Sequence, residues 1–170
     1  MQFTHFRKLS IILVIALLVI PAARAGAVTL TAGEKAPGFC LKDVDGNQVT
    51  LEQFLGKTVV IAFWSTWCSR CEEELTFLKE TLGERTDVAV LLVNQDSERK
   101  VSLDRVRAIR QKLGIRFPIL LDEGLSLWEV YGVNALPTSV VIGKDGALKL
   151  IEPNFYWGSP ENLLAAIGQS

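Results

Sequence analysis

Two of the chain's three cysteines, Cys68 and Cys71, are separated by only two residues and lie at a predicted junction between a strand and a helix. The segment Thr58–Trp64 is apolar and rich in β-branched residues, which predicts a buried strand. The segment Glu72–Leu82 predicts a helix with acidic residues in its first turns, where the helix dipole favours them. The cysteine pair is therefore expected where a strand passes into the N-terminus of a helix.

Strand and helix signals alternate along the rest of the chain, with no repeat and no low-complexity tract. The further predicted elements are a short strand around Phe39–Leu41, a short helix capped by Thr50 and reaching Leu55, a strand at Val88–Val93, a helix capped by Ser102, a strand at Phe117–Leu121, a short helix at Gly124–Tyr131, a hairpin of Thr138–Ile142 and Ala147–Ile151, and a last helix with Ser159 as its N-cap. This order predicts an α/β fold in which a central mixed sheet is flanked by helices.

Residues 1–25 have the layout of an export signal. Arg7 and Lys8 form a charged start, Ile11–Ile20 is an unbroken apolar run, and small residues end it at Ala23-Arg24-Ala25. The run is shorter than the roughly 20 residues that a membrane-spanning helix needs. We therefore expect cleavage and a mature domain of residues 26–170 in the periplasm. The alternative is an uncleaved anchor, in which residues 9–28 hold the protein at the inner membrane.

The mature chain is expected to be a single domain with a mildly acidic balance. Residues 1–25 hold three basic residues and no acidic one, so their removal from a chain with 18 basic and 19 acidic residues leaves 15 and 19, a net charge of −4. This balance gives no electrostatic footprint for nucleic acid or anionic lipid. A domain of this length buries a real core, and we expect a monomer.

The only histidine of the chain, His5, lies within the predicted signal. The mature chain therefore has no Ser-His-Asp triad, no Cys-His nucleophile pair and no histidine metal ligand. A zinc site normally needs four Cys or His ligands, whereas the mature chain offers three cysteines, with Cys40 far from the pair in sequence. We expect neither a metal nor another cofactor.

The spacing of Cys68 and Cys71 favours a reversible redox centre over a structural disulfide. A bond between them would close a loop of only four residues, which removes little entropy from the unfolded chain. At a helix N-terminus, unpaired N–H groups and the helix dipole stabilise a thiolate. Cys68 is therefore the expected nucleophile. Cys71 lies one turn further on, near enough to attack the resulting mixed disulfide and release the substrate.

A set of motifs spread over residues 33–169 matches those of one known family. The motifs are Ala36-Pro37-Gly38-Phe39 followed by Asp45-Gly46, the F-W-x-x-W-C-x-x-C stretch that begins at Phe63, an extra helix and strand at Ser97–Leu121, and Leu136-Pro137-Thr138 before a hairpin. In these features the chain resembles the thioredoxin-like superfamily, and most closely its exported TlpA/ResA-type thiol-disulfide oxidoreductases.

This resemblance implies a thioredoxin fold with an N-terminal extension and with the helix–strand insert between the CxxC pair and a cis proline. It implies that Pro137 is cis and faces the sulfurs, and that Leu136 and Thr138 help present backbone to an extended substrate. Two residues depart from the family pattern. Arg70 precedes the second cysteine where proline is common, and Thr76 stands where related chains often have a helix-kinking proline.

Three residues around the pair, and also Cys40, each have two interpretations. Trp67 either offers a docking face to substrate or belongs to the core. Glu74 lies three residues after Cys71 on the same helical face and matches the position of an acidic residue in related proteins; it either manages the proton of the buried thiol or simply suits an early helical turn. Arg70 either favours the Cys68 thiolate or is solvated. We interpret Cys40 as a small buried hydrophobe rather than a third redox thiol.

The sequence thus predicts an exported thiol-disulfide oxidoreductase that acts on the thiols and disulfides of envelope proteins. Arg70 and the helix N-terminus favour a thiolate whereas Glu72–Glu74 oppose it, which predicts a reductant, for example in cytochrome c maturation, supplied by a membrane dithiol donor. Two alternatives share the fold. A peroxiredoxin-like thiol peroxidase would need a P-x-x-x-T-x-x-C pattern, and Trp64-Ser65-Thr66-Trp67 lacks the proline; a copper-carrying binding protein would need a downstream histidine.

Overall fold

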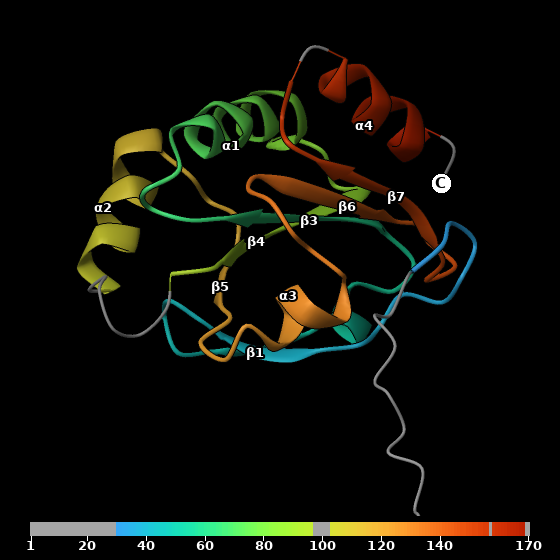
Figure 1. Ribbon diagram of the computed structural model, residues 1–170, viewed down its shortest axis with the longest axis horizontal. Coiled ribbons are helices and arrows are strands. Elements are labelled where there is room, and N and C mark those ends of the chain that lie inside the picture. Colours follow the sequence, from blue (N-terminus) through green and yellow to red (C-terminus); the bar gives the residue numbers. More distant parts are fainter. Residues whose placement is uncertain (1–29, 97–102, 157, 169–170) are drawn as a thin grey trace, which may run out of the picture.

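A seven-stranded mixed sheet forms the centre of the computed structural model, which describes residues 30–96, 103–156 and 158–168 (Figure 1). The strand order is β2-β1-β5-β4-β3-β6-β7. Neighbours β3, β4 and β5 run parallel, and the other pairs are antiparallel. The strands are β1 (Cys40–Asp43), β2 (Gln48–Thr50), β3 (Thr58–Trp64), β4 (Val88–Asn94), β5 (Ile119–Leu121), β6 (Thr138–Ile142) and β7 (Leu148–Pro153).

Helices cover both faces of this sheet. Helices α1 (Ser69–Leu82), α2 (Leu103–Leu113) and α4 (Ser159–Gly168) pack on one face, and the short helices η1 (Leu51–Phe54) and α3 (Ser126–Val130) pack on the other. Successive residues of β3 point to alternate faces, so that Ala62 and Trp64 join the first core and Ile61 and Phe63 the second. The chain is therefore a three-layer α/β domain, which confirms the predicted fold class.

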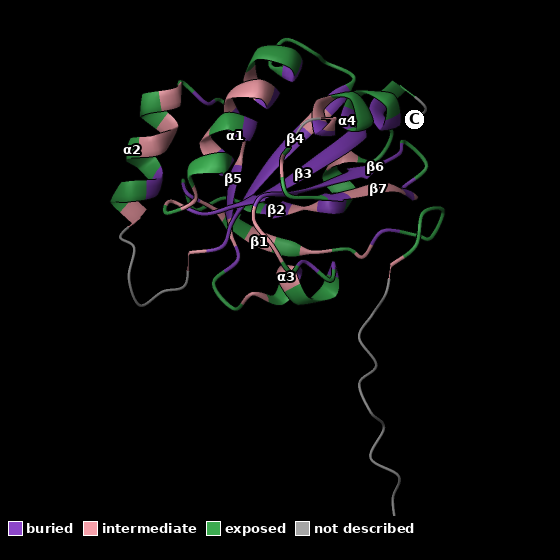
Figure 2. Cartoon of the chain, turned by 45° about the horizontal axis from the view of Figure 1, so that its top comes forward, coloured by how far each residue is buried: buried purple, intermediate pink, exposed green. Residues whose placement is uncertain are grey.

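Strand β3 is buried along its whole length (Figure 2). It pairs in parallel with β4 and antiparallel with β6, and helices cover it on both sides. A strand buried on both faces needs apolar residues at every position, which explains why its sequence is a continuous apolar run instead of an alternating one. Because β3 is fixed on all sides, the turn that follows Trp64 starts from a rigid base.

The predicted strands at β3 and β6 have the observed bounds, whereas the last two elements differ in detail. Strand β7 starts one residue later than expected and continues to Pro153. Ser159 is the first residue of α4 rather than its N-cap, and its hydroxyl donates a hydrogen bond to Oε1 of Glu152 at 3.0 Å. The predicted cap Ser102 lies outside the described residues.

The expectation that Cys40 is buried was wrong. Cys40 is exposed on β1, and its Sγ accepts a hydrogen bond from Nε2 of Gln48 on the neighbouring strand at 2.9 Å. Free cysteines are among the most buried residue types, which led to that expectation, but exposed and half-buried residues alternate along β1. Lys42, two residues after Cys40, lies on the same exposed face and was the signal in the sequence for this orientation.

The predicted export signal and anchor fall within residues 1–29, outside the described part of the chain. Over residues 30–96, 103–156 and 158–168, no helix combines the length and apolar character that crossing a membrane requires.

Candidate active site

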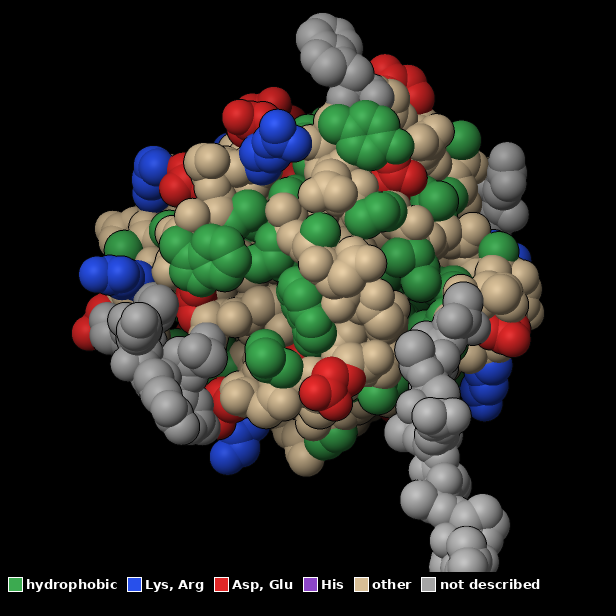
Figure 3. All heavy atoms as spheres, viewed as in Figure 1, with side chains coloured by type: hydrophobic (Ala, Val, Ile, Leu, Met, Phe, Trp, Pro, Cys, Tyr) green, Lys and Arg blue, Asp and Glu red, His purple; other side chains and the backbone are tan. Residues whose placement is uncertain are grey.

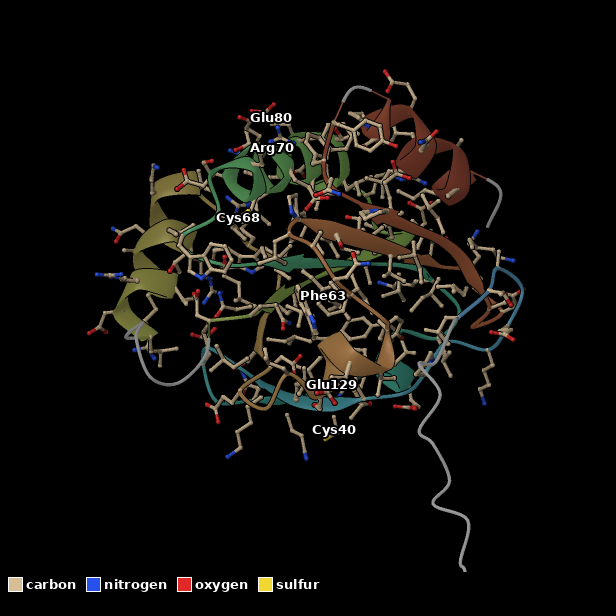
Figure 4. All side chains as sticks on the ribbon, in the orientation of Figure 1. Cys40, Phe63, Cys68, Arg70, Glu80 and Glu129 are labelled. Atoms are coloured by element: carbon tan, nitrogen blue, oxygen red, sulfur yellow. A yellow bond between two sulfur atoms is a disulfide. The ribbon has the colours of Figure 1, made fainter. Side chains whose placement is uncertain are left out.

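Cys68 and Cys71 form a disulfide at the start of α1, with their Cα atoms 5.3 Å apart. Cys68 is the N-cap of the helix and has extended backbone angles, and its Sγ accepts a hydrogen bond from the backbone N–H of Cys71 at 3.2 Å. Cys71 is fully buried, while Cys68 is half-buried. The pair is therefore asymmetric, because Cys68, labelled in Figure 4, is partly accessible whereas Cys71 is enclosed by the domain.

A tight turn connects β3 to the disulfide. The N–H of Cys68 donates to the carbonyl of Ser65 at 3.3 Å, which closes the turn Ser65-Thr66-Trp67-Cys68. The N–H of Thr66 donates to both carboxylate oxygens of Asp96, each at 3.2 Å. The turn is thus fixed both internally and by a residue 30 positions away, at the end of β4.

The two departures from the family pattern leave α1 continuous from Ser69 to Leu82. The hydroxyl of Thr76 donates to the carbonyl of Glu72 at 2.7 Å, a bond to the preceding turn that a proline side chain cannot make. Arg70 is exposed. Its neighbour Glu72 forms an ion pair with Lys112 of α2, with Nζ 2.6 Å from Oε2.

Glu74 is buried one turn after Cys71, with 1% of its surface exposed. Burial raises its pKa to about 7, against the opposing effect of a hydrogen bond from the hydroxyl of Ser139, 2.8 Å from Oε1. Its second oxygen, Oε2, has no hydrogen-bond partner among the described residues. A carboxyl group with this pKa exchanges its proton near neutral pH, and it lies on the same helical face as the inner cysteine.

The loop before β6 contains the expected cis peptide bond, between Leu136 and Pro137. The carbonyl of Pro137 accepts a hydrogen bond from the N–H of Asn154 at 2.7 Å, and the hydroxyl of Thr138 donates to the carbonyl of Ala135 at 2.8 Å. Leu136 is half-buried and packs against the same core cluster as Cys68. Pro137 and Thr138 are buried, so of these three residues Leu136 offers the most accessible side chain.

Trp67 is 71% exposed, which excludes the interpretation that it belongs to the core. It lies in the turn that closes on Cys68. Figures 3 and 4 show the molecule in the same orientation, and Figure 4 labels Cys68. On this face, Figure 3 shows hydrophobic side chains spread across the centre, with most of the charged ones around the rim. This side of the molecule has the composition expected of a surface that contacts polypeptide.

Two polar residues of the site did not emerge from the sequence. Ser139, the partner of Glu74, is 65 residues away from it, and no local pattern indicates that contact. Asp96 had a weak signal, because Asn94-Gln95-Asp96 is a polar group at the carboxyl end of an apolar strand predicted to lie beside the strand that leads to the cysteines.

Comparison with known proteins gives the family. A family model described as the AhpC/TSA family matches residues 32–151. The chain belongs to this family. Thiol-disulfide oxidoreductase ResA of Bacillus anthracis is 33% identical over 120 residues, which is 71% of this chain and 67% of that protein. ResA of Geobacillus thermodenitrificans is 34% identical over 124 residues, 72% of this chain and 69% of that protein.

Solved structures agree with this assignment. A Chlorobium tepidum protein proposed to be thiol:disulfide interchange protein DsbE has a TM-score of 0.73 at 25% identity and covers 82% of this chain and 100% of its own. The exposed lipoprotein thioredoxin of Streptococcus pneumoniae has a TM-score of 0.65 at 29% identity, over 79% of this chain and 100% of its own. The chain is thus a thiol-disulfide oxidoreductase with a thioredoxin-like fold.

Proposed function

We propose that this AhpC/TSA-family protein is an exported reductant of protein disulfides in the bacterial envelope, with Cys68 as the nucleophile and Cys71 as the resolving cysteine. The observation that carries the proposal is the asymmetry of the disulfide at the start of α1, where Cys68 is half-buried and Cys71 is fully buried. The sulfur nearer the surface is the one that a second protein reaches first.

The reaction balances in two exchanges. The thiolate of Cys68 attacks one sulfur of a substrate disulfide, forms a mixed disulfide and expels the other substrate sulfur as a thiolate, which takes up a proton. The Cys71 thiolate then attacks Sγ of Cys68, releases the second substrate thiol and leaves the Cys68–Cys71 disulfide. Two electrons pass from the enzyme to the substrate, and the enzyme is left in the oxidised state described above.

Glu74 is proposed to accept the proton of Cys71 during the second exchange. The buried thiol must lose its proton before it attacks, and few groups on the inner side of the disulfide can receive it. Glu74 is buried on the same face of α1, has a pKa of about 7 and has a free oxygen at Oε2. Its hydrogen bond from Ser139 holds the carboxyl group against β6 in a fixed orientation.

Trp67, Leu136 and Thr138 are proposed to bind the substrate around the disulfide, together with the cis Pro137. Support comes from the 71% exposed indole of Trp67 and from the half-buried Leu136, which packs against the same cluster as Cys68. The carbonyl of Pro137 is already bonded to Asn154. Contacts to a substrate backbone would therefore come from the neighbouring residues of this loop.

The direction of the reaction follows from the charges around Cys68. An oxidant such as DsbA has a reduction potential near −120 mV and stabilises its thiolate strongly, whereas thioredoxin has a reduction potential near −270 mV. Here the helix N-terminus and Arg70 favour the thiolate, Glu73 opposes it, and the charge of Glu72 is paired with Lys112. Because the Cys68 thiolate is not strongly stabilised, the reduction potential of the Cys68–Cys71 pair is proposed to lie nearer that of thioredoxin than that of DsbA.

A reductant in an oxidising compartment needs a source of electrons, and we propose a dithiol donor in the inner membrane. Apocytochrome c is one candidate substrate, as the resemblance to TlpA/ResA-type proteins implies. Mass measurement of the protein from the envelope is expected to give a soluble monomer that begins at Gly26 or Val28. A full-length, membrane-bound product would show that residues 9–28 form an anchor.

Alkylation trapping in growing cells tests the direction. The proposal predicts that most Cys68–Cys71 pairs are dithiols, and that they become disulfides when the membrane donor is deleted. A pair that is almost wholly oxidised in wild-type cells, with a potential near that of DsbA, would make the protein an oxidase instead.

A further inference from the structure

The carboxyl end of strand β4 holds the turn that carries Trp67 and Cys68. The N–H of Thr66, the second residue of this turn, donates to both oxygens of Asp96 at 3.2 Å. One residue earlier, the N–H of Gln95 donates to the carbonyl of Trp64 at 2.8 Å. Two adjacent residues of one segment therefore fix both the last residue of β3 and the start of the turn.

The carboxylate of Asp96 is itself held in place. Nδ2 of Asn94 donates to Oδ2 of Asp96 at 2.9 Å, and the N–H of Asp96 donates to Oδ1 of Asn94 at 3.2 Å. Asn94 is buried, with 3% of its surface exposed. Its own carbonyl accepts a hydrogen bond from the N–H of Asp122 at 3.2 Å, which ties it to the segment before α3. Asp96 is thus oriented by a buried neighbour and not by solvent.

Within the turn, the N–H of Cys68 donates to the carbonyl of Ser65, which closes the turn on itself. This bond alone does not orient the turn relative to the sheet. The bond between Thr66 and Asp96 supplies that orientation, since Asp96 lies at the end of a strand paired with β3. Trp67 itself projects into solvent.

We infer that Asp96 is a positioning residue for disulfide exchange, which holds Cys68 at the distance and angle at which its sulfur meets that of Cys71. The inference rests on the proposed function, because it concerns the same cysteine pair. Holding two reacting groups in place raises their effective concentration. Loss of the contact therefore lowers the tendency of Cys68 and Cys71 to bond to each other, and the disulfide becomes easier to reduce.

The equilibrium with glutathione measures this effect. In it the protein disulfide and two glutathione thiols exchange for the protein dithiol and one glutathione disulfide. Replacing Asp96→Ala removes the acceptor of the Thr66 N–H and is expected to shift this equilibrium about tenfold toward the dithiol. Asp96→Asn keeps an acceptor oxygen at the same place and is expected to stay within about threefold of the wild type. Asp104→Asn, an exposed carboxylate on α2, is the matched control and should cause no shift.

Two outcomes would overturn the inference. An equal shift in Asp96→Asn and Asp96→Ala would assign the effect to the charge of Asp96 and not to its hydrogen bonds, and no shift in either would remove the positioning role. Thr66→Pro deletes the donor and leaves Asp96 in place, at a turn position that accepts proline. Thr66→Pro should therefore shift the equilibrium as far as Asp96→Ala does. If the alanine variant does not fold, Thr66→Pro provides the test in its place.

A failure of this inference is distinguishable from a failure of the proposed function. If Asp96 variants behave as wild type while Cys68→Ser is inactive, the function stands and only the positioning role falls. If the wild-type pair itself does not exchange with glutathione, the proposed function falls.

Discussion

Cys68 and Cys40 lie in two regions of the molecule that give a cysteine different surroundings. Cys68 follows the fully buried strand β3, caps α1 and is bonded to a buried partner. Cys40 lies on β1 near one edge of the sheet, exposed, with a hydrogen bond from Gln48 as its only described polar contact (Figure 4). No helix N-terminus, second thiol or buried carboxyl group accompanies it among the described residues.

This difference shows that redox function belongs to the surroundings of a cysteine and not to its exposure. Cys40 is the more accessible of the two, yet both other cysteines of the chain are bonded to each other and leave it without a disulfide partner. The region around Cys68 supplies both a disulfide partner, Cys71, and a carboxyl group with a raised pKa, together with an exposed tryptophan. The predictions below change Cys68, Glu74 and Trp67 in the first region and Cys40 in the second.

The largest expected effect is that of Cys68→Ser, which should abolish turnover of a protein disulfide. Without the outer thiolate no mixed disulfide forms, because Cys71 is fully buried. Reduction of insulin disulfides by the reduced variant is a direct assay. Turnover that persists would assign the attack to Cys71 or Cys40 and would erase the contrast between the two regions.

Glu74→Gln sharpens the comparison, because it removes the ionisable group behind the disulfide and keeps its shape. The raised pKa of Glu74 means that the unfolded chain ionises first, so the wild type loses stability as pH rises from about 4.5 to about 7. A shift of this size corresponds to about 3 kcal/mol. Denaturant unfolding of the oxidised proteins should show the wild type losing that amount relative to Glu74→Gln between pH 4.5 and pH 8.

The same variant is expected to slow the release of a trapped substrate by about a hundredfold, since the acceptor of the Cys71 proton is lost. Glu80→Gln, an exposed glutamate further along α1, is the control and should change neither stability nor release. If the stability of Glu74→Gln has the same pH dependence as that of the wild type, Glu74 is not the titrating group and its proposed role falls.

A smaller effect is expected for Trp67→Ala, about fivefold in kcat/KM toward a protein disulfide. The exposed indole contributes contact area to a bound polypeptide, whereas a small disulfide does not need it. Rates with oxidised glutathione should therefore stay unchanged. Leu55→Ala, which removes another exposed apolar side chain, is the control. Equal losses with both substrates would point to altered cysteine chemistry instead of docking.

The smallest expected effect is that of Cys40→Ala, which should leave exchange within about twofold of the wild type. Its side chain is exposed, so the substitution leaves no cavity in the core. Steady-state assays under reducing conditions would reveal a larger loss. Such a loss, in a variant that is still folded, would make Cys40 a third participant.

The sequence predicted those parts of the fold and site that depend on local pattern. Strands β3 and β6 were predicted with their observed bounds, β3 from its apolar, β-branched run and β6 from the hairpin signal Lys144-Asp145-Gly146 that follows it. The junction of β3 with a helix N-terminus at Cys68 follows from the same local signals. The cis bond at Pro137 came from family resemblance, since nothing in the residues around it requires that isomer.

The contacts that the sequence missed are those between distant segments. Glu74 meets Ser139 across 65 positions, and Thr66 meets Asp96 across 30, so that neither contact leaves a periodic trace. The burial of Cys40 was mispredicted because it was inferred from the usual burial of free cysteines, without regard to the lysine two residues further on. Pairing of β1 with β2 and β5 decides which face is exposed, and that pairing is a property of the whole sheet.

The division of labour between Cys68 and Cys71 is the central claim, and trapping of mixed disulfides tests it most directly. Cys71→Ser and Cys68→Ser are each expressed in a Cys40→Ala background, so that no third thiol forms adducts, and the covalent adducts are identified by mass spectrometry. The account predicts that Cys71→Ser accumulates protein adducts through Cys68 and that Cys68→Ser accumulates none. Adducts that persist in Cys68→Ser and vanish in Cys71→Ser would contradict it.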